Sequence, residues 1–319
     1  MEKELLIKEN DRNNSIQLSF MLELVYTVLT LCDYDIMTPY HKDFIEDMKR
    51  VIYPKVSREV ISYFKQISQE NFRFVIPCTI ALSLVFEDGS IKSKGTIKPY
   101  YLKRFGGIEK VHDCVGQLNR FMAETHYTDI FIHKRTFYND YMNKFKNIIF
   151  EVMRDVQAWY DSDHVKLTAY LSPLVHPGGF GVSTCHEHAK CVLGALMNVQ
   201  NDIQFPLSYN VYFHEFSHHF VDQYVEDNWC SIRDLLGVRI CTAVGNNDIP
   251  RHKEFICETI IRGLSNYYCF NKQLRINEQD YSSYPLSKNI FDALKKSNCT
   301  KIDHDVYKKM IGTIHAEIR

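Results

Sequence analysis

The sequence predicts an α+β fold, with a mainly helical region over residues 1–160 and a mixed region over residues 161–319. Apolar residues recur at helical spacing through most of the first region, whereas residues 165–171 alternate between apolar and polar side chains, as in a strand. Two long helical stretches follow, at 207–225 and 251–264. We therefore expect a small sheet beside the first of these two helices.

The first region is predicted to contain five helices, at 16–32, 40–68, 77–86, 111–126 and 136–160. Pro54 should break the second of them, and Pro77 should open the third. The first is interrupted by Gln17 and Glu23 and is preceded by acidic residues, so it is typical of a buried helix and not of a signal peptide or a membrane span.

In the second region, Pro177-Gly178-Gly179 predicts a turn between short strands. These strands are expected at Phe180–Cys185 and at Cys191–Met197. Helices at 286–297 and 304–317 should then cover the core.

Composition indicates an ordinary globular protein. Of its 319 residues 45% are apolar and 24% are charged, and the formal net charge of −1 gives no reason to expect a nucleic-acid partner. The ten cysteines are spread along the chain, many within apolar runs, which is typical of free thiols in a reducing compartment. We therefore expect a cytoplasmic protein.

The most informative motif is His214-Glu215-Phe216-Ser217-His218, a His-Glu-x-x-His pattern within the predicted helix 207–225. Residues four apart share one helix face, so His214 and His218 can bind the same zinc ion. Glu215 can reach a water in an open coordination position and take its proton. The spacing predicts one zinc per chain, with Glu215 as the general base.

A catalytic zinc usually has a third protein ligand. Val221 and Tyr224 exclude a metzincin continuation, so a glutamate of the helix at 251–264 is the remaining candidate. Glu258 lies among apolar residues and is preferred, whereas Glu254 falls in the first turn, where the helix dipole and solvent already explain an acid. Glu254 stays open as the alternative ligand. Asp222 is a candidate for orienting His218, although a solvated acid on the helix face is the simpler interpretation.

These two helices resemble the gluzincin branch of zinc metallopeptidases. The Tyr212-Phe213-His214-Glu215-Phe216-Ser217-His218 run and Glu258-Thr-Ile-Ile-Arg262 are similar to an uncharacterised bacterial family of proposed metallopeptidases, known as a domain of unknown function. Arg262 stands where thermolysin-like enzymes carry an aspartate, which favours the uncharacterised family. The resemblance implies a zincin-like catalytic region, in which the Phe180–Cys185 or Ala189–Leu196 strand binds a peptide by adding it to the sheet.

The sequence thus predicts a zinc metallopeptidase that acts on peptides or proteins; a non-catalytic zinc core for sensing or partner binding is the alternative. Arg262 could hold Glu258 or a substrate carboxylate. Candidate donors to the oxyanion of the reaction are four tyrosines, Tyr209, Tyr212, Tyr267 and Tyr268. A second metal is conceivable in a cluster of four potential ligands, Cys185, His186, His188 and Cys191.

Overall fold

The computed structural model describes residues 5–34, 42–72, 75–175, 178–182, 186–194, 205–237, 240, 244 and 249–318. The chain has an α+β fold and divides into two compact units in alternating stretches. The first unit comprises Met1–Asn147, Thr168–Thr184 and Lys190–Ile203. The second comprises Ile148–Leu167, Cys185–Ala189 and Gln204–Arg319. The chain thus passes repeatedly from one unit to the other.

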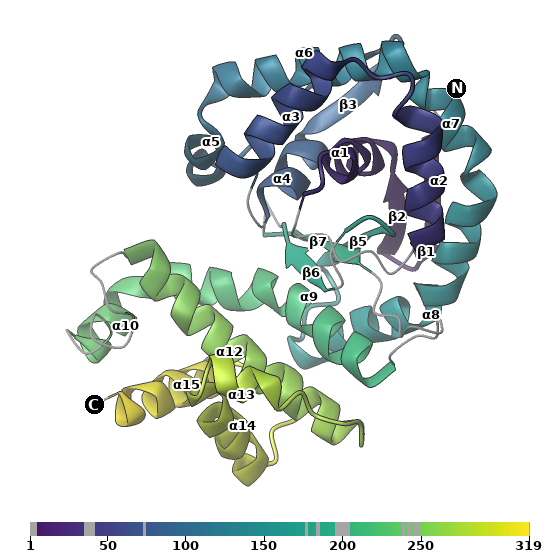
Figure 1. Ribbon diagram of the computed structural model, residues 1–319. Coiled ribbons are helices and arrows are strands. Elements are labelled where there is room, and N and C mark those ends of the chain that lie inside the picture. Colours follow the sequence, from purple (N-terminus) through teal and green to yellow (C-terminus); the bar gives the residue numbers. More distant parts are fainter. Residues whose placement is uncertain are drawn as a thin grey trace. The chain divides into compact units, whose positions relative to one another are not determined.

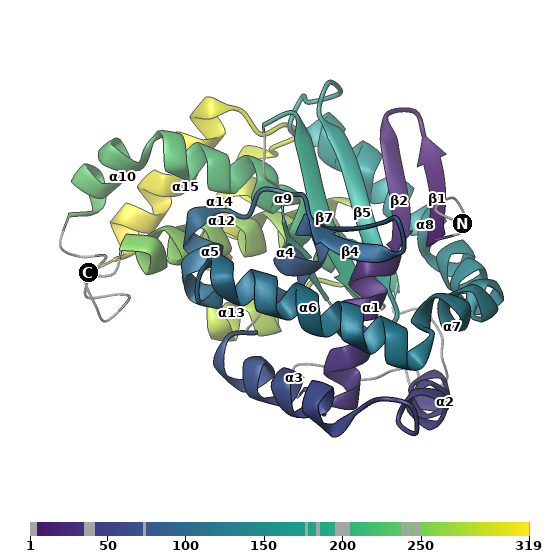
Figure 2. The ribbon, with the colours of Figure 1, turned by 90° about the horizontal axis from the view of Figure 1, so that it is seen from above.

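The larger sheet has the strand order β1-β2-β5-β7-β6 and its strands are β1 (Leu6–Asp11), β2 (Asn14–Ser19), β5 (Lys166–Ser172), β6 (Gly179–Gly181) and β7 (His188–Gly194). Figure 2 shows β7, β5, β2 and β1 lying side by side. β1 and β2 form an antiparallel hairpin, and Ile16 of β2 is registered with Ala169 of β5 in a parallel pair. β6 is antiparallel to β7 and forms one edge of the sheet.

The helices of the first unit pack around α1 (Phe20–Leu31), all of whose residues are buried. Ser19 begins this helix, because its side chain accepts a hydrogen bond from the Leu22 amide. Figure 1 shows α1 among its neighbours. The other helices that lie in or enter this unit are α2 (Lys42–Ile52), α3 (Arg58–Glu70), α4 (Ile76–Ser83), α5 (Pro99–Phe105), α6 (Ile108–Thr125), α7 (Tyr127–His133) and α8 (Arg135–Trp159).

Two predicted helices of this unit need correction. The helix expected at 16–32 begins only at Phe20, because residues 14–19 pair with strands on both sides as β2. The helix expected at 77–86 ends at Ser83, and the chain continues as β3 (Leu84–Glu87), which pairs with β4 (Ser90–Ser93). Asp88 and Gly89 join the two strands with positive φ angles of 53° and 77°, as a two-residue hairpin requires.

One carboxyl group is buried in the middle of α1. Glu23 is 0% exposed, and within the described residues neither of its oxygens has a hydrogen bond of normal geometry. Burial raises the pKa of Glu23 to about 8, and the hydroxyl groups of Ser172 and Tyr138 offset this only in part. The side chain is therefore neutral at pH 7.

The second unit is built on α9 (Phe205–Asp227), which packs along α12 (Ile249–Asn271). The end of α8 also belongs to this unit: its Trp159 contacts Phe213 of α9 and Tyr268 of α12, with ring centroids 5.4 and 5.8 Å apart. Phe213 also stacks on Tyr268, with 4.2 Å between the ring centroids. These aromatic contacts fix α9 against α12.

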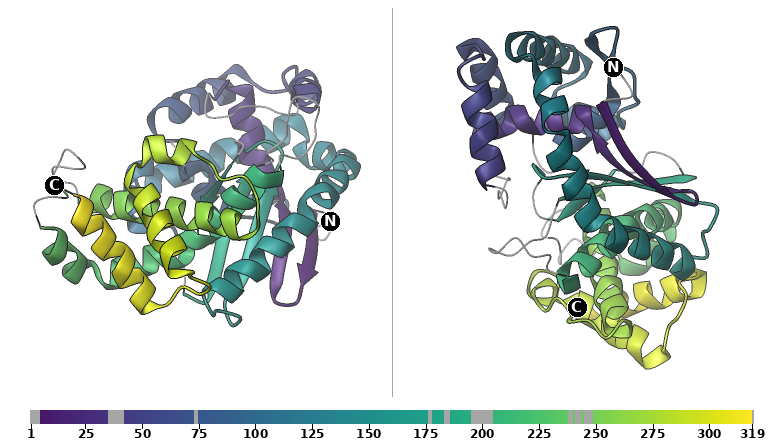
Figure 3. Two further views of the ribbon diagram at one scale, coloured as in Figure 1. Left: turned by 90° about the horizontal axis from the view of Figure 1, so that it is seen from below. Right: turned by 90° about the vertical axis from the view of Figure 1, so that its right-hand side faces the viewer.

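The remaining helices of the second unit are α10 (Trp229–Leu236), α13 (Gln279–Ser283), α14 (Leu286–Ser297) and α15 (His304–Glu317). α12 packs on α14, and α14 on α15 (Figure 3). Gly263 permits the first of these contacts, because a β-carbon at this position would lie 2.6 Å from Cβ of Ile290 and 2.8 Å from the carbonyl oxygen of Ser287. A larger residue there would separate the two helices.

Two further expectations concern the cysteines and the membrane. None of the described cysteines forms a disulfide bond, and all of them except Cys230 are buried. In the described part of the chain, no helix has both the length and the apolar character needed to cross a membrane.

Candidate metal centre

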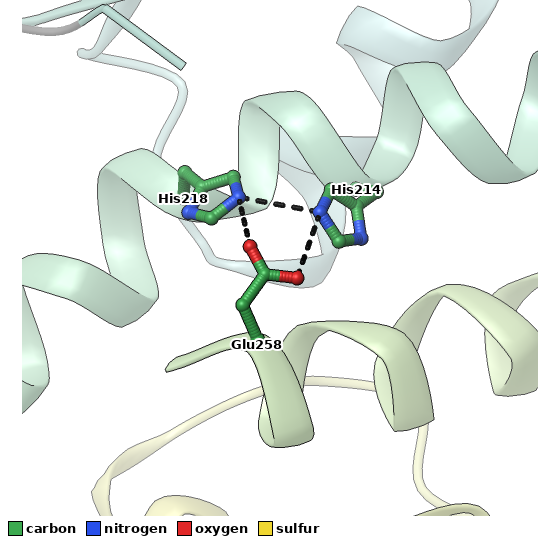
Figure 4. Close-up of side chains that lie close together, drawn as sticks. All are labelled: His214, His218 and Glu258. Atoms are coloured by element: carbon green, nitrogen blue, oxygen red, sulfur yellow. Dashed lines mark hydrogen bonds and ion pairs between the residues drawn. The ribbon is translucent and has the colours of Figure 1, made fainter. Parts of the chain in front are cut away.

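Two histidines of α9 and one glutamate of α12 converge in the second unit (Figure 4). The Nε2 atoms of His214 and His218 lie 3.2 Å apart. Oε1 of Glu258 is 3.4 Å from Nε2 of His218, and Oε2 is 3.7 Å from Nε2 of His214. The three side chains thus direct their ligand atoms at one point.

The spacing of these atoms matches a zinc coordination shell. Ligands about 2.1 Å from a zinc ion at the corners of a tetrahedron lie about 3.4 Å apart. The two imidazole nitrogens are 3.2 Å apart, and each has one oxygen of the Glu258 carboxylate at a similar distance, Oε1 at 3.4 Å from His218 and Oε2 at 3.7 Å from His214. Two imidazoles and a carboxylate are also a donor set that zinc accepts in catalytic sites. The residues present therefore fit a zinc ion.

Asp222 orients His218. Its Oδ1 lies 3.2 Å from Nδ1 of His218, so a proton on Nδ1 can be donated to the carboxylate. This hydrogen bond leaves the lone pair of Nε2 free to bind a metal. The side chain of Asp222 is 56% exposed, so this residue is a solvated helix-face acid and an orienting carboxylate at the same time.

The electrostatics of the cluster favour an anionic carboxylate beside one neutral imidazole. Burial lowers the pKa of His214 to about 3, so this ring is neutral and can act as a ligand. Burial raises the pKa of Glu258, but His214, His218 and Arg262 outweigh it and hold the pKa below the ordinary value. Burial lowers the pKa of His218, but the carboxylates of Asp222 and Glu258 outweigh this effect, so the net pKa is raised. A bound metal would take the place of a proton on Nε2 of His218.

Arg262 holds the glutamate in place. Its Nε and Nη2 lie 3.0 and 2.9 Å from Oε2 of Glu258, and its Nη1 donates to Oδ1 of Asp280 at 2.5 Å. The ring of Tyr284 lies 4.7 Å from the guanidinium carbon. Every nitrogen of the guanidinium group contacts an acid of the protein itself. Of the two roles considered for Arg262, the structure thus shows the contact with Glu258.

Asp280 is itself anchored, through Asn266 of α12. The Asn266 amide nitrogen lies 3.5 Å from Oδ2 of Asp280, and its oxygen accepts from the amide of Asn277 at 2.7 Å and from the side chain of Asn210 at 3.1 Å. These contacts join α9, α12 and the segment that leads into α13. Sequence reasoning missed Asn266 and Asp280. The spacing of Glu258, Arg262 and Asn266, four residues apart on an apolar helix, was the available signal for Asn266.

The other predicted carboxylates occupy different environments. Glu215, the predicted base, is 8% exposed and directly follows His214 in α9. Glu254 is exposed and lies outside the group formed by His214, His218 and Glu258. The geometry therefore favours Glu258 over Glu254 as the third potential ligand.

The four candidate tyrosines lie in the core or donate to other acids. The hydroxyl groups of Tyr209 and Tyr268 donate to Glu151 at 2.5 Å and to Asp155 at 2.6 Å. Tyr212 and Tyr267 are at most 1% exposed. The structure thus gives Tyr209 and Tyr268 roles in packing α9 and α12 against α8.

The second candidate metal cluster is not assembled as far as the structure describes it. Cys185 lies outside the described residues. Cys191 is fully buried in β7, whereas His186 is exposed in the turn before this strand and His188 begins it. Within the described residues, the only group of three potential ligands is His214, His218 and Glu258.

Comparisons with curated proteins and with solved structures found no match. A comparison with protein families matches residues 33–279, a range that contains α9 and α12 in full and therefore all three potential ligands. Because this match covers more than half of the chain, the protein belongs to the family described as Domain of unknown function (DUF4932).

Proposed function

We propose that this protein is a zinc-dependent hydrolase, specifically a metallopeptidase with a zincin-like catalytic region at residues 161–319. The observation that carries the proposal is the convergence of His214, His218 and Glu258 at the spacing of a tetrahedral zinc shell. Within the described residues these are the three potential ligands, which leaves the fourth position for water or substrate. A purely structural zinc site would use four protein ligands.

Each residue has a distinct task in this proposal. Zinc held by the three side chains would lower the pKa of a water molecule towards about 7 and polarise a substrate carbonyl. Glu215 would accept the proton of the attacking water and pass it to the leaving amine. Asp222 fixes the tautomer of His218, and Arg262 keeps Glu258 anionic and correctly aimed. The substrate would be a peptide or protein. The free thiols support a reducing compartment, so we place the protein in the cytoplasm.

Metal analysis tests the centre itself. We expect one zinc per chain by elemental analysis of the purified protein, and a loss of this zinc in His214→Ala and His218→Ala. His112→Ala, which removes an exposed histidine of the first unit, is the matched control and should keep the zinc. Equal metal content in all four proteins would refute the site.

Peptide hydrolysis tests the chemistry. Incubation with a mixed peptide library, followed by mass spectrometry, detects cleavage even when the natural substrate is unidentified. Glu215→Gln should keep the zinc yet lower the cleavage rate by about 10²-fold or more, the contribution of a positioned acid or base. Glu226→Gln replaces an exposed glutamate of the same helix and should leave the rate unchanged. No cleavage by the zinc-loaded wild type would favour a non-catalytic zinc core for sensing or partner binding.

A further inference from the structure

A cavity of about 530 Å³ lies in the second unit, away from the metal ligands. One face of α9 supplies five of its lining residues, namely His219, Phe220, Gln223, Tyr224 and Asp227, and Asn228 directly follows this helix. The rest come from the start of α15 and from the segments before β5 and β7. Its volume falls within the usual range of small-molecule sites, roughly 300 to 1,000 Å³.

The cavity and the metal centre use opposite faces of the same helix. Each residue of an α-helix advances by about 100°, so the positions that line the cavity centre on the side roughly opposite His214 and His218. Neither of these histidines nor Glu258 lines the cavity. A ligand in the cavity would therefore not be a ligand of the metal.

Three acids and four histidines, His164, His186, His219 and His304, are among the described residues that line the cavity. Glu187, Asp227 and Asp303 line it and are exposed, and no lysine or arginine is found among its described lining residues. One oxygen of Asp303 caps α15, since it accepts from the amides of Asp305 and Val306 at 3.0 and 2.9 Å. Three carboxylates around one hollow, without a lysine or arginine in its described lining, attract a positive ligand.

Aromatic rings complete the lining. Tyr160 stacks on Phe220 and Tyr224 stacks on Tyr307, with centroids 4.3 and 4.0 Å apart. Aromatic rings bind organic cations through their π-electrons, and more strongly when the site is shielded from water. Ser162 also lines the cavity. It is 3% exposed and, among the described residues, its hydroxyl group has no hydrogen-bond partner. A serine hydroxyl group can accept a hydrogen bond from a cationic N–H group.

The same residues are poorly suited to a metal ion. Nε2 of His219 lies 3.0 Å from the carbonyl oxygen of His186 and donates to it, which removes this nitrogen as a ligand. Within the described residues, three ligand atoms converge only at the centre described above. We propose that the cavity is a binding site for an organic cation that carries a guanidinium or primary ammonium group.

Ligand-observed NMR titrations with a matched pair of probes test this proposal. Acetyl-arginine amide carries the guanidinium group, and acetyl-citrulline amide is its neutral isostere. We expect acetyl-arginine amide to bind. Acetyl-citrulline amide should bind at least about fivefold more weakly, because it lacks the charge that forms one or two partly exposed ion pairs. Equal binding of both probes, or no binding of the first at about 10 mM, would overturn the proposal.

Variants locate the binding. Asp227→Asn combined with Asp303→Asn should weaken acetyl-arginine amide about fivefold, and asparagine at 303 still caps the helix. The control, Asp234→Asn with Asp292→Asn, changes the net charge equally but at residues outside the cavity lining. An equal loss in both double variants would show nonspecific attraction and refute the site.

Two further arms separate the source of the cation and the role of zinc. Tighter binding of agmatine than of acetyl-arginine amide would identify a free amine as the source, and the reverse order would identify the side chain of a peptide. The double variant His214→Ala with His218→Ala should bind agmatine and acetyl-arginine amide as the wild type does, because neither histidine lines the cavity. Loss of binding in this variant would assign the cation to the metal centre and overturn the proposal.

Discussion

Glu23 in the first unit is fully buried and the side chain of Glu258 in the second is only 16% exposed, yet the pKa values of the two carboxyl groups shift in opposite directions. Glu23 is buried within α1 and has the hydroxyl groups of Ser172 and Tyr138 beside it, and burial raises its pKa to about 8. Glu258 has an arginine and two histidines around it, and its pKa falls below the ordinary value. Burial is common to both. The difference lies in the partners.

This difference separates a structural acid from a functional one. Burial without a cation drives a carboxyl group to its neutral form, in which it can share hydrogen bonds but binds a metal poorly. Burial beside Arg262 keeps the carboxylate charged where water is scarce, which a metal ligand requires. A buried glutamate in a sequence therefore indicates a site only when its counter-charges are found.

The largest effect is expected for Glu23. Between pH 4.5, its ordinary pKa, and about 8, the folded protein holds a proton that the unfolded chain releases, so the free energy of unfolding falls as the pH rises through this window. Glu23→Gln stays neutral and should remove this component, which amounts to roughly 3 to 5 kcal/mol at pH 8. Urea unfolding of both proteins from pH 5 to 9 measures it.

The contrary result is easily recognised. If the two unfolding curves keep a constant separation across this range, Glu23 is ionised in the folded protein and its environment is not apolar. Glu23 and Glu258 would then both be ionised in the folded protein, and their pKa values would not differ in direction.

The next effect concerns the partner of Glu258. Arg262→Met leaves Glu258 and Asp280 without their cation and should lower the free energy of unfolding by about 2 kcal/mol, between the values for exposed and fully buried pairs. The side chain of Arg262 is 26% exposed, which is why the upper value is not expected. Arg233→Met, at an arginine 53% exposed beside Asp234, is the control and should change it by less than about 0.5 kcal/mol. Similar losses in both would show that the buried pairing has no special strength.

The smallest of the three effects tests whether the charge of Glu258 is used. Glu258→Gln should weaken zinc binding by about 10-fold or more, equivalent to about 1.4 kcal/mol, because the amide is a poor ligand. Glu254→Gln, one turn earlier and exposed, should change it by less than about threefold. Competition titration with a chromogenic chelator measures both. The reverse order would assign the third ligand to Glu254.

Local patterns predicted the helices better than the strands. The predicted ranges 286–297 and 304–317 coincide with α14 and α15, because an apolar face repeats within each helix. β2 has one partner, β1, directly before it in the sequence and a second, β5, more than 140 residues away, and local spacing does not reveal the second pairing. The compact units are likewise built from stretches far apart in the sequence, since Thr168–Thr184 belongs to the first unit with Met1–Asn147. Asp88-Gly89 is a typical two-residue hairpin turn, so the pairing of β3 with β4 is predictable from the sequence.

The candidate site was predictable where one helix determines it. The four-residue step between His214 and His218 follows from helix geometry alone. Glu258 was preferred because its neighbours are apolar, which is also a local property. Asp280 could not be predicted, since its contact with Arg262 depends on the path of the chain after α12 ends at Asn271.

Gly263 is not a ligand, yet its close contact with α14 helps to set the position of the candidate metal centre. Gly263 directly follows Arg262, and its lack of a side chain lets α14 lie against α12. A methyl group there would press on Ile290 and turn or lift the helix that carries Glu258. Directed evolution for a new metal or substrate could therefore change the position of the Glu258 carboxylate by substitutions on α14, which packs against α12, while every ligand stays unchanged.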